Sequence, residues 1–306
     1  MRRAESERKE TVVSRPGSFR YRYKNTAYIM LLPALILLGI FVMWPLVMAV
    51  IRAFQDYNTG QFVGFYNFRY ILMTPSFVKA FKNVLILTVC IVSLTMVLTF
   101  LLALLMRSLG NRMGYFTRAC VFIPFFISGI VTSVIFNLLL NYGGGLFTSL
   151  LIDAGKEPIA FAVEDNWPQI TIIAITIWMT FGYQTLIMYA GLLQIPKSLY
   201  EAAQLDGANF LHQTLFITIP NMKNYFVLVC ISLVTANLQM FEIPFMVTGG
   251  GPLESTLTPV MYLYNSFRDP GRPQNVTIAG ALLVMILIMF INIIVFKTVR
   301  SEKSGE

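Results

Sequence analysis

Long runs of apolar residues without an acidic or basic side chain recur along the chain and alternate with short polar segments. A helix needs about 20 apolar residues to cross the hydrocarbon core of a bilayer, and six runs reach that length. They predict membrane spans at about residues 27–51, 83–106, 119–141, 168–192, 224–247 and 274–296. Leucine and isoleucine fill the runs without strict alternation, which favours helices over a lipid-facing β-barrel. The pattern therefore predicts an all-α integral membrane protein with six transmembrane helices.

Two of the predicted spans contain residues that break helices. The glycines at 143–145 predict that the third span ends near Asn141, because glycine permits a tight backbone turn. The fifth span contains a single charge, Glu242, and Pro244 follows two residues later. A proline inside a helix predicts a kink at that point.

The low content of charged residues excludes a water-soluble enzyme. Of the 306 residues, 56% are hydrophobic and 12% are charged, whereas soluble domains carry about 25% charged residues. A soluble protein of this length could not cover so much apolar surface. The 14% of aromatic residues excludes a disordered chain as well. The chain is therefore predicted to lie in a lipid bilayer.

Basic residues fall mostly on one side of the predicted spans. Sixteen of the 23 Lys and Arg lie before the first span, in the loops 107–118 and 191–224, and after the last span. The cytoplasmic side of membrane proteins is enriched in Lys and Arg, so both termini are predicted to be cytoplasmic. The net charge of +8 mostly reflects this asymmetry and is not taken as a sign of nucleic-acid binding.

These patterns divide the chain into three parts. Residues 1–24 form a basic cytoplasmic tail, residues 25–297 a transmembrane domain, and residues 298–306 a second cytoplasmic tail. The first apolar run begins late and is too long for the apolar region of a signal peptide. It is therefore predicted to remain as an anchored span.

The sequence contains no recognisable catalytic or metal site. No GxxxxGK[ST] phosphate loop is present, and the single histidine, His212, excludes a credible Ser–His–Asp arrangement. The three cysteines, Cys90, Cys120 and Cys230, fall in predicted spans without metal-ligand spacing. They are predicted to be small buried hydrophobic residues. Any nucleotide hydrolysis is expected on another chain.

The loop between the fourth and fifth predicted spans carries the most specific signal. Ser198 followed three residues later by Glu201 has the spacing of a capping box. Pro196 stops the preceding helix from continuing, so a short new helix is predicted from about Leu199. The small residues that follow allow another surface to approach closely: Ala202, Ala203, Gly207 and Ala208.

The spacing of these residues resembles the EAA motif of ABC importer permeases. The matching residues are Glu201-Ala202-Ala203, Gly207, Ile217 and Ile219-Pro220, and Ile219 replaces the leucine of the family pattern. Three further segments resemble the carbohydrate branch of that family: Asp206-Gly207-Ala208, Thr248–Pro252 followed by Ser255-Thr256, and Phe62–Phe68. The chain is similar to the maltose and glycerol-phosphate transporter permeases over about residues 25–297.

The resemblance implies a transporter of several subunits in the plasma membrane of a prokaryote. It implies a second related permease, two cytoplasmic ATPase subunits that hold ATP and Mg²⁺, and an extracellular solute-binding protein. The segment 199–211 would be the cytoplasmic coupling helix that docks on an ATPase. Its contact residues would be Glu201, Ala202, Ala203, Asp206, Gly207 and Ala208.

Two residues of this motif also have a simpler interpretation. Glu201 could do no more than cap its own helix, which contributes about 0.5–2 kcal/mol. Gly207 could be an ordinary helix glycine, which costs about 1 kcal/mol relative to alanine. Docking on an ATPase is favoured for both, because the full motif is present.

The resemblance also places residues on a sugar path. Tyr183 in the fourth span and Asn237 in the fifth match family positions that line the sugar cavity. Thr180, Met179 and Met240 are neighbouring candidates. Tyrosine supplies an apolar ring with a hydroxyl, and asparagine supplies both a donor and an acceptor, which suits sugars.

Gln239 and Glu242 complicate this path. At about 100° per residue, Gln239 and Glu242 share a helix face, whereas Asn237 and Gln239 point to nearly opposite sides. A charge at the centre of a bilayer costs at least about 2.5–3.5 kcal/mol, so Glu242 needs a partner or water. It could gate the outer mouth, bind substrate or pair with the second permease. Alternatively it could be purely structural, as an ion pair or as a carboxylate at the membrane interface.

Other functions remain as alternatives. Within the class, the solute could be a glycerol phosphate or a polyol. Outside it, the chain could be a secondary transporter or channel, which needs no coupling helix and usually has inverted repeats or intramembrane charge pairs. A membrane scaffold or sensor is disfavoured by the polar residues in the fourth and fifth spans.

Overall fold

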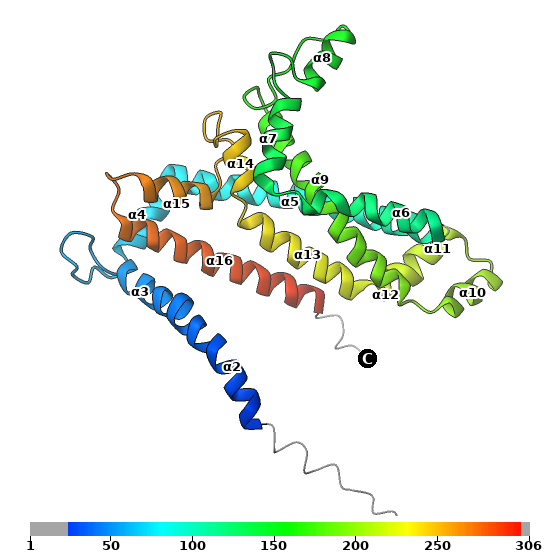
Figure 1. The fold of residues 1–306 in the computed structure, drawn as a ribbon, viewed down its shortest axis with the longest axis horizontal. Helices are drawn as coiled ribbons and strands as arrows, with labels where there is room; N and C mark the ends of the chain where they lie inside the picture. The colour runs from blue at the N-terminus through cyan, green and yellow to red at the C-terminus, as the bar shows by residue number, and fades with distance from the viewer. Residues whose placement is uncertain (1–23, 110, 301–306) are drawn as a thin grey trace, which may run out of the picture. The chain divides into compact units, whose positions relative to one another are not determined.

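The computed structural model describes residues 24–109 and 111–300, so most of both predicted cytoplasmic tails lies outside the described residues. These residues form helices joined by turns, and the β-type pairing found among them is the single bridge Gln55–Phe62. The chain divides into two compact units, Met1–Arg52 and Ala53–Glu306 (Figure 1).

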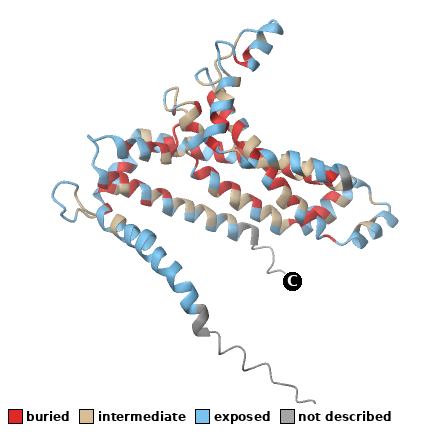
Figure 2. Ribbon diagram, viewed as in Figure 1, coloured by how far each residue is buried: buried red, intermediate tan, exposed pale blue. Residues whose placement is uncertain are grey.

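The first unit holds one apolar helical segment. It consists of α2 (Lys24–Leu38), a π-helical turn η1 (Gly39–Met43) and α3 (Trp44–Ala53). Residues Tyr28–Ala53 are long and apolar enough to cross a membrane, close to the predicted first span. The side chains of this segment are exposed along nearly all of its length (Figure 2), as expected for a helix that faces lipid or another subunit.

The second unit contains the remaining helices. In chain order they are α4 (Tyr66–Met73), α5 (Pro75–Ser108), α6 (Asn111–Phe122), η2 (Ile123–Phe126), α7 (Gly129–Leu139), α8 (Leu146–Asp153), α9 (Trp167–Leu193), α10 (Lys197–Leu205), α11 (Phe210–Gln213), η3 (Thr214–Thr218), α12 (Ile219–Asn221), α13 (Lys223–Leu238), α14 (Glu242–Val247), α15 (Pro259–Arg268) and α16 (Gln274–Arg300).

Three long helices form the body of this unit. α5, α9 and α16 each satisfy the length and hydropathy expected of a membrane span. Proline lies in the first turn of both α5 and α9, where its missing N–H leaves no helical bond unmade. α5 begins at Pro75, well before the predicted boundary at residue 83, because Lys79 and Lys82 are accommodated in its first turns.

The third predicted span is a broken helix. α6 and η2 lead into α7 through a bend of 96°. Pro124 in η2 and the extended backbone of Ile127 end the first half, and Ser128 caps the second half by accepting from the Val131 N–H. α7 ends at Leu139, as the glycine triplet predicted. A second bend, of 69°, separates α11–α12 from α13, so the described residues contain four continuous candidate spans, or six if each bent pair is one span.

The fifth predicted span, 224–247, is interrupted and is not one continuous helix. α13 ends at Leu238 and α14 begins separately at Glu242. A continuous helix would leave the Met240 carbonyl facing Pro244, which has no N–H to donate. In the break, Thr258 Oγ1 donates to that carbonyl at 2.9 Å. Pro244 therefore lies in the first turn of a new helix instead of kinking an old one.

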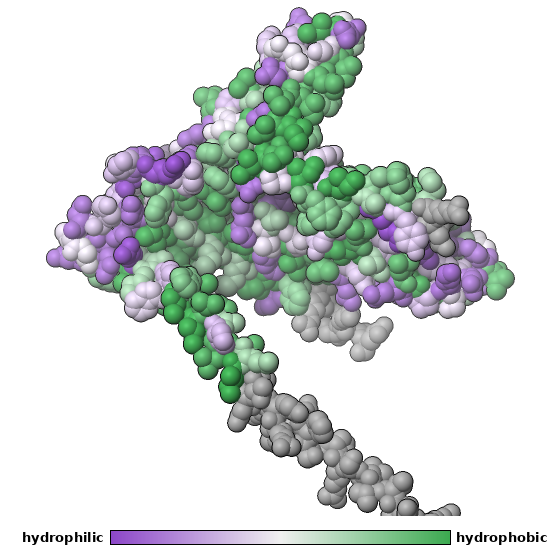
Figure 3. Space-filling view, viewed as in Figure 1, coloured by the Kyte–Doolittle hydropathy of each residue, from purple (hydrophilic) through white to green (hydrophobic). Residues whose placement is uncertain are grey.

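The core consists of apolar side chains between α5, α9, α13 and α16. Ile91, Ile172 and Leu238 belong to one cluster within it. Outward-facing residues are also apolar, including Ile86 and Val89 on α5 and Phe290 on α16, and apolar side chains cover much of the surface in Figure 3. Such exposed apolar area is typical of a protein that faces lipid.

The prediction that the three cysteines are buried is wrong. All three are free, but Cys120 is exposed and Cys90 and Cys230 are only partly buried. Cys230 packs against the core cluster of Ile91 and Leu238, whereas the exposed position of Cys120 suits contact with lipid.

Candidate functional site

Two of the helix breaks meet inside the second unit. Gly129 is the first residue of α7 and Glu242 is the first residue of α14. A Cβ added at Gly129 would overlap a carboxylate oxygen of Glu242. Further along, Asn137 Nδ2 of α7 donates to the Met246 carbonyl of α14 at 2.8 Å. The two half-helices are thus tied at two levels and form one joint, the α7–α14 junction.

Glu242 lies at the N-terminal end of α7. The unbonded N–H groups of a helix N-terminus carry partial positive charge and stabilise a nearby carboxylate. Within the described part of the chain no ion pair and no side-chain hydrogen bond of Glu242 is found, and the residue is exposed. The structural interpretation of this residue therefore rests on its position beside the start of α7.

The predicted path residues at the end of α13 and just after it differ in burial. Asn237 is 2% exposed, and its Nδ2 donates to the Leu233 carbonyl of its own helix at 2.7 Å. Met240 packs in the apolar core. Gln239 is exposed, and its Nε2 donates to the Thr235 carbonyl at 3.2 Å. The opposite directions predicted for Asn237 and Gln239 are present in the structure.

The predicted path residues on α9 lie in the part of that helix that packs against η2, before the bend into α7. The ring of Tyr183 is partly exposed and stacks on Phe125 of η2, with centroids 4.7 Å apart. Thr180 Oγ1 donates to the Thr176 carbonyl at 2.8 Å, and Met179 is half-buried. Phe125 itself is 45% exposed.

Two residues near these side chains were missed by the sequence reasoning. Gln184 is buried and its Nε2 donates to Ser232 Oγ of α13 at 3.3 Å, while its Oε1 has no hydrogen-bond partner. Gly182 packs so tightly that an added Cβ would overlap the Val121 backbone. Gln184 could have been identified from the sequence, because a side-chain amide inside an apolar span is energetically costly and is usually functional or hydrogen-bonded.

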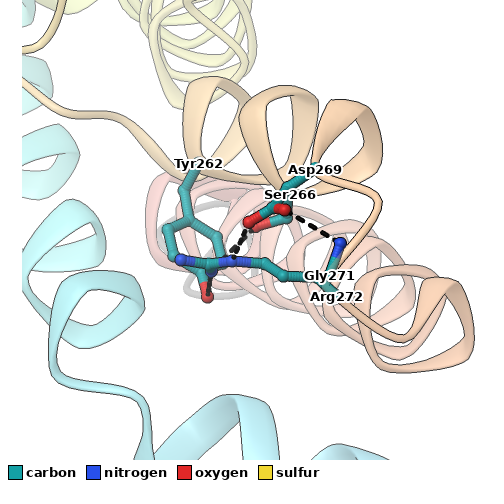
Figure 4. A network of polar contacts seen from close by, with 5 residues as sticks. All are labelled: Tyr262, Ser266, Asp269, Gly271 and Arg272. Atoms are coloured by element: carbon teal, nitrogen blue, oxygen red, sulfur yellow. Dashed lines mark hydrogen bonds and ion pairs between the residues drawn. The ribbon is translucent and has the colours of Figure 1, made fainter.

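A polar cavity of about 350 Å³ lies at the end of the unit that carries the glycine-rich loop. Gly249 and Gly250 adopt positive φ angles of 60° and 88° and shape one wall. Arg272 lies on the other wall, with Nη1 donating to Tyr262 Oη at 2.6 Å and Ser266 Oγ at 3.2 Å (Figure 4).

Arg272 is fixed in this cavity by a local ion pair. Its Nε lies 3.2 Å from Asp269 Oδ2, and Asp269 Oδ1 accepts from the Gly271 N–H at 3.0 Å. The loop itself is anchored to α5, where Asn83 Nδ2 donates to the Glu254 carbonyl at 2.7 Å. No predicted path residue lines this cavity.

The predicted capping box in the loop after α9 is wrong. α10 begins at Lys197, two residues earlier than expected, with Pro196 at the N-cap and no side-chain cap. The fixed φ of proline starts the helix there, so Ser198 and Glu201 lie inside the helix. Glu201 is exposed, and the start of α10 has no side-chain cap, which argues against the interpretation that Glu201 caps its own helix.

Gly207 ends α10 and is not a helix-interior glycine. Its φ is 78°, its N–H donates to the Gln204 carbonyl, and the Ala208 N–H donates to the Ala203 carbonyl. These two bonds form a Schellman motif, which requires a left-handed residue and favours glycine.

The predicted continuous segment 199–211 is therefore two short helices. α11 starts after Asn209, whose Oδ1 accepts from the His212 N–H at 2.8 Å. Glu201 and Ala202 in α10 are exposed, as are Asp206 and Gly207 in the turn after it. Ala203 and Ala208 are half-buried.

Comparison with known proteins places the chain in one family. Residues 107–300 match the family described as the binding-protein-dependent transport system inner membrane component. The sulfoquinovosyl glycerol transport system permease protein of Agrobacterium fabrum is 31% identical, over 90% of this chain and 91% of its own length. The trehalose/maltose transport system permease protein of Thermococcus litoralis is 28% identical, over 94% of this chain and 98% of its own length.

A solved structure shares the fold. It is a bacterial alginate ABC transporter in complex with an alginate pentasaccharide-bound periplasmic protein, and the matched chain gives a TM-score of 0.78 at 23% identity. The match covers 91% of this chain and 98% of the other. The chain thus belongs to the family of inner membrane components of binding-protein-dependent transport systems.

Proposed function

We propose that the chain is a permease subunit that carries a sugar or an oligosaccharide into a prokaryotic cell, driven by ATP hydrolysis on separate subunits. Its family consists of transport components, so it supplies a membrane path and not a catalytic centre. Relatives named for sulfoquinovosyl glycerol and for trehalose or maltose support a carbohydrate solute.

The proposed coupling to an ATPase subunit is supported mainly by the exposed turn that ends α10. The Schellman motif at Gly207 displays the EAA residues on the surface, and a Cβ added at Gly207 would meet nothing within 4 Å of this chain. Such a surface, with small residues and the two carboxylates Glu201 and Asp206, suits docking into a groove of an ATPase subunit. Closure of the ATPase around ATP and Mg²⁺ would then move α10 and bias the permease between two packings.

The substrate path would lie beside the helix breaks. Tyr183, Thr180 and Met179 reach this region from α9, and Glu242 reaches it from α14. The break between α13 and α14 lies close in sequence to Asn237, Gln239 and Met240. Irregular backbone at membrane depth is tolerated where protein or a water-filled cavity surrounds it. Asn237 and Met240 are buried in this packing. A solute would therefore reach them only in the other packing of the permease.

The orientation follows from the same assignment. The end with α10 would face the cytoplasm with both termini, as the basic residues predicted. The end with the Arg272 cavity would then face outward and receive the solute-binding protein, and a second related permease would complete the path.

Reconstitution tests this proposal. The chain is coexpressed with its second permease and ATPase subunits, placed in proteoliposomes with the binding protein, and tested with radiolabelled maltose, lactose and glycerol 3-phosphate. We expect uptake of a sugar that requires ATP and Mg²⁺ on the ATPase side. Uptake by this chain without an ATPase would support the secondary transporter or channel instead, and uptake of glycerol 3-phosphate alone would correct the solute class.

A further inference from the structure

The side chain of Tyr200 connects α10 to the rest of the second unit. α10 has no buried residue. Within the described part of the chain, the polar side-chain contacts from its nine residues to other elements come from Tyr200 alone. The ring of Tyr200 also packs against the apolar cluster that includes Leu192 and Met222.

The first of these contacts reaches the end of α5. The guanidinium of Arg107, in the last turn of α5, lies over the ring of Tyr200 with its central carbon 4.2 Å from the ring centroid. A cation above a tyrosine ring is attracted by the negative face of the ring. Arg107 also suits its position at a helix C-terminus, where a positive charge is favourable.

The second contact reaches η3. Tyr200 Oη lies 2.9 Å from the buried Thr218 Oγ1, and Thr218 Oγ1 itself donates to the Gln213 carbonyl. A hydroxyl has one hydrogen to give, so Tyr200 is the donor to Thr218. η3 leads through α12 into α13, which packs against α5 and α9.

We propose that Tyr200 is the positioning residue through which displacement of α10 reaches both α5 and η3. The inference rests on the proposed docking of α10 on an ATPase and names the side chain that passes the movement on. Its ring face holds the end of one core helix and its hydroxyl holds the segment that precedes another. Moving α10 without Tyr200 would shift the docking helix and leave the core helices in place.

The test compares coupling in variants of the complete transporter in proteoliposomes. Tyr200→Leu removes both polar contacts, Tyr200→Phe keeps the ring over Arg107, and Thr218→Val removes the other partner of the hydrogen bond. The measured quantity is solute uptake per ATP hydrolysed, together with the amount of ATPase subunit that copurifies. Tyr115→Leu is the matched control, because Tyr115 also lies under an arginine, Arg118, but on α6.

We expect Tyr200→Leu to lower uptake per ATP by about tenfold while the ATPase still copurifies, in the range measured for coupling residues. Tyr200→Phe and Thr218→Val should each lower it by about threefold, and together by no more than either alone, because they remove the same hydrogen bond. Tyr115→Leu should leave the ratio unchanged.

The outcomes separate this inference from the proposed function. A wild-type ratio in Tyr200→Leu and Tyr200→Phe, with normal ATP-dependent uptake, overturns the role of Tyr200 and leaves the proposed function intact. A wild-type chain that neither binds an ATPase nor needs ATP overturns both. If Tyr200→Leu fails to assemble, additive losses in the Tyr200→Phe and Thr218→Val pair overturn the hydrogen-bonded path.

Discussion

The α10 segment and the α7–α14 junction are held in the structure in opposite ways. α10 has no buried residue, and Tyr200 connects it to other elements. At the junction, Gly129 of α7 and Pro244 of α14 are buried. Glu242 lies against Gly129, and Asn137 bonds to the Met246 carbonyl.

This difference indicates a division of labour. A helix without buried residues can exchange its surface for that of a partner at little cost to the fold. The junction instead contains buried residues and a hydrogen bond between its two half-helices, so a change there removes contacts within the fold itself. Changes at α10 should therefore alter coupling and leave stability unchanged, whereas changes at the junction should alter stability first.

The largest expected effect on transport is at Gly207. Aspartate adopts left-handed backbone more readily than most residues, so Gly207→Asp should leave the subunit folded and inserted. A charged side chain on the docking turn should lower coupled uptake by about 30-fold, as expected for an interface hot spot of about 2 kcal/mol. Uptake and ATPase stimulation in proteoliposomes measure the effect.

Gly60→Asp is the control for that variant. Gly60 also has a positive φ, 68°, with open space around it, but lies in the loop after α3. Uptake should be unchanged there. Normal coupling in Gly207→Asp would remove the basis for treating α10 as the docking element.

The largest expected effect on stability is at Gly182, where α9 approaches α6. An added Cβ would overlap the Val121 backbone, which cannot move aside as a side chain can. Gly182→Ala should lower the free energy of unfolding by about 3 kcal/mol, at the upper end for overpacking. Thermal unfolding in detergent measures it.

Gly114→Ala is the matched helix glycine. A Cβ there would make ordinary contacts at 3.8 and 3.9 Å, so this variant should be neutral or stabilising. Equal stability of the two variants would show that α9 and α6 leave room for a methyl group at Gly182.

A smaller effect is expected where the two half-helices of the junction meet. Gly129→Ala places a methyl group against the Glu242 carboxylate and should cost about 1–2 kcal/mol. Glu242→Ala frees that space, so the double variant should be more stable than the sum of the two single effects predicts. Strict additivity of the unfolding free energies would show that Glu242 does not lie on the start of α7.

The smallest effects come from two asparagines that each make one local bond. Asn137→Ala removes the bond to Met246, and Asn209→Ala removes the cap of α11. Each loss should cost about 1 kcal/mol, for Asn137→Ala in the free energy of unfolding of the whole unit and for Asn209→Ala in the free energy of local opening of α11. Asn137→Ala should lower the melting temperature of the whole unit, whereas Asn209→Ala should only speed amide exchange around α11. Equal changes in melting temperature would contradict the comparison.

Local patterns were sufficient for much of the site. Proline and glycine predicted that a new helix follows Pro196 and that α7 ends before the glycine triplet, although α10 begins at Lys197 and not near Leu199. The role of Gly207 could not be predicted in this way, because the same local sequence is compatible with a glycine inside a helix and with one just after its end. The φ of 78° decided between them.

The breaks inside the apolar runs were harder to predict, since hydropathy measures composition and not direction. A run with an internal proline has the same apolar content whether it is straight, kinked or interrupted. The break before α14 depends on Thr258, which lies 18 residues after the Met240 carbonyl that it satisfies. Such a partner cannot be identified from the local sequence.

The sequence by itself determined that the chain enters a membrane, where most of its apolar segments lie, and which loop carries the EAA motif. These properties depend on the transfer of apolar residues out of water and on short motifs, and both are local. Only the tertiary structure decided which spans are broken, that Glu242 lies on the start of α7, and that Tyr200 connects α10 to two core elements. Those features depend on contacts between residues far apart in the chain, which form only when the helices pack.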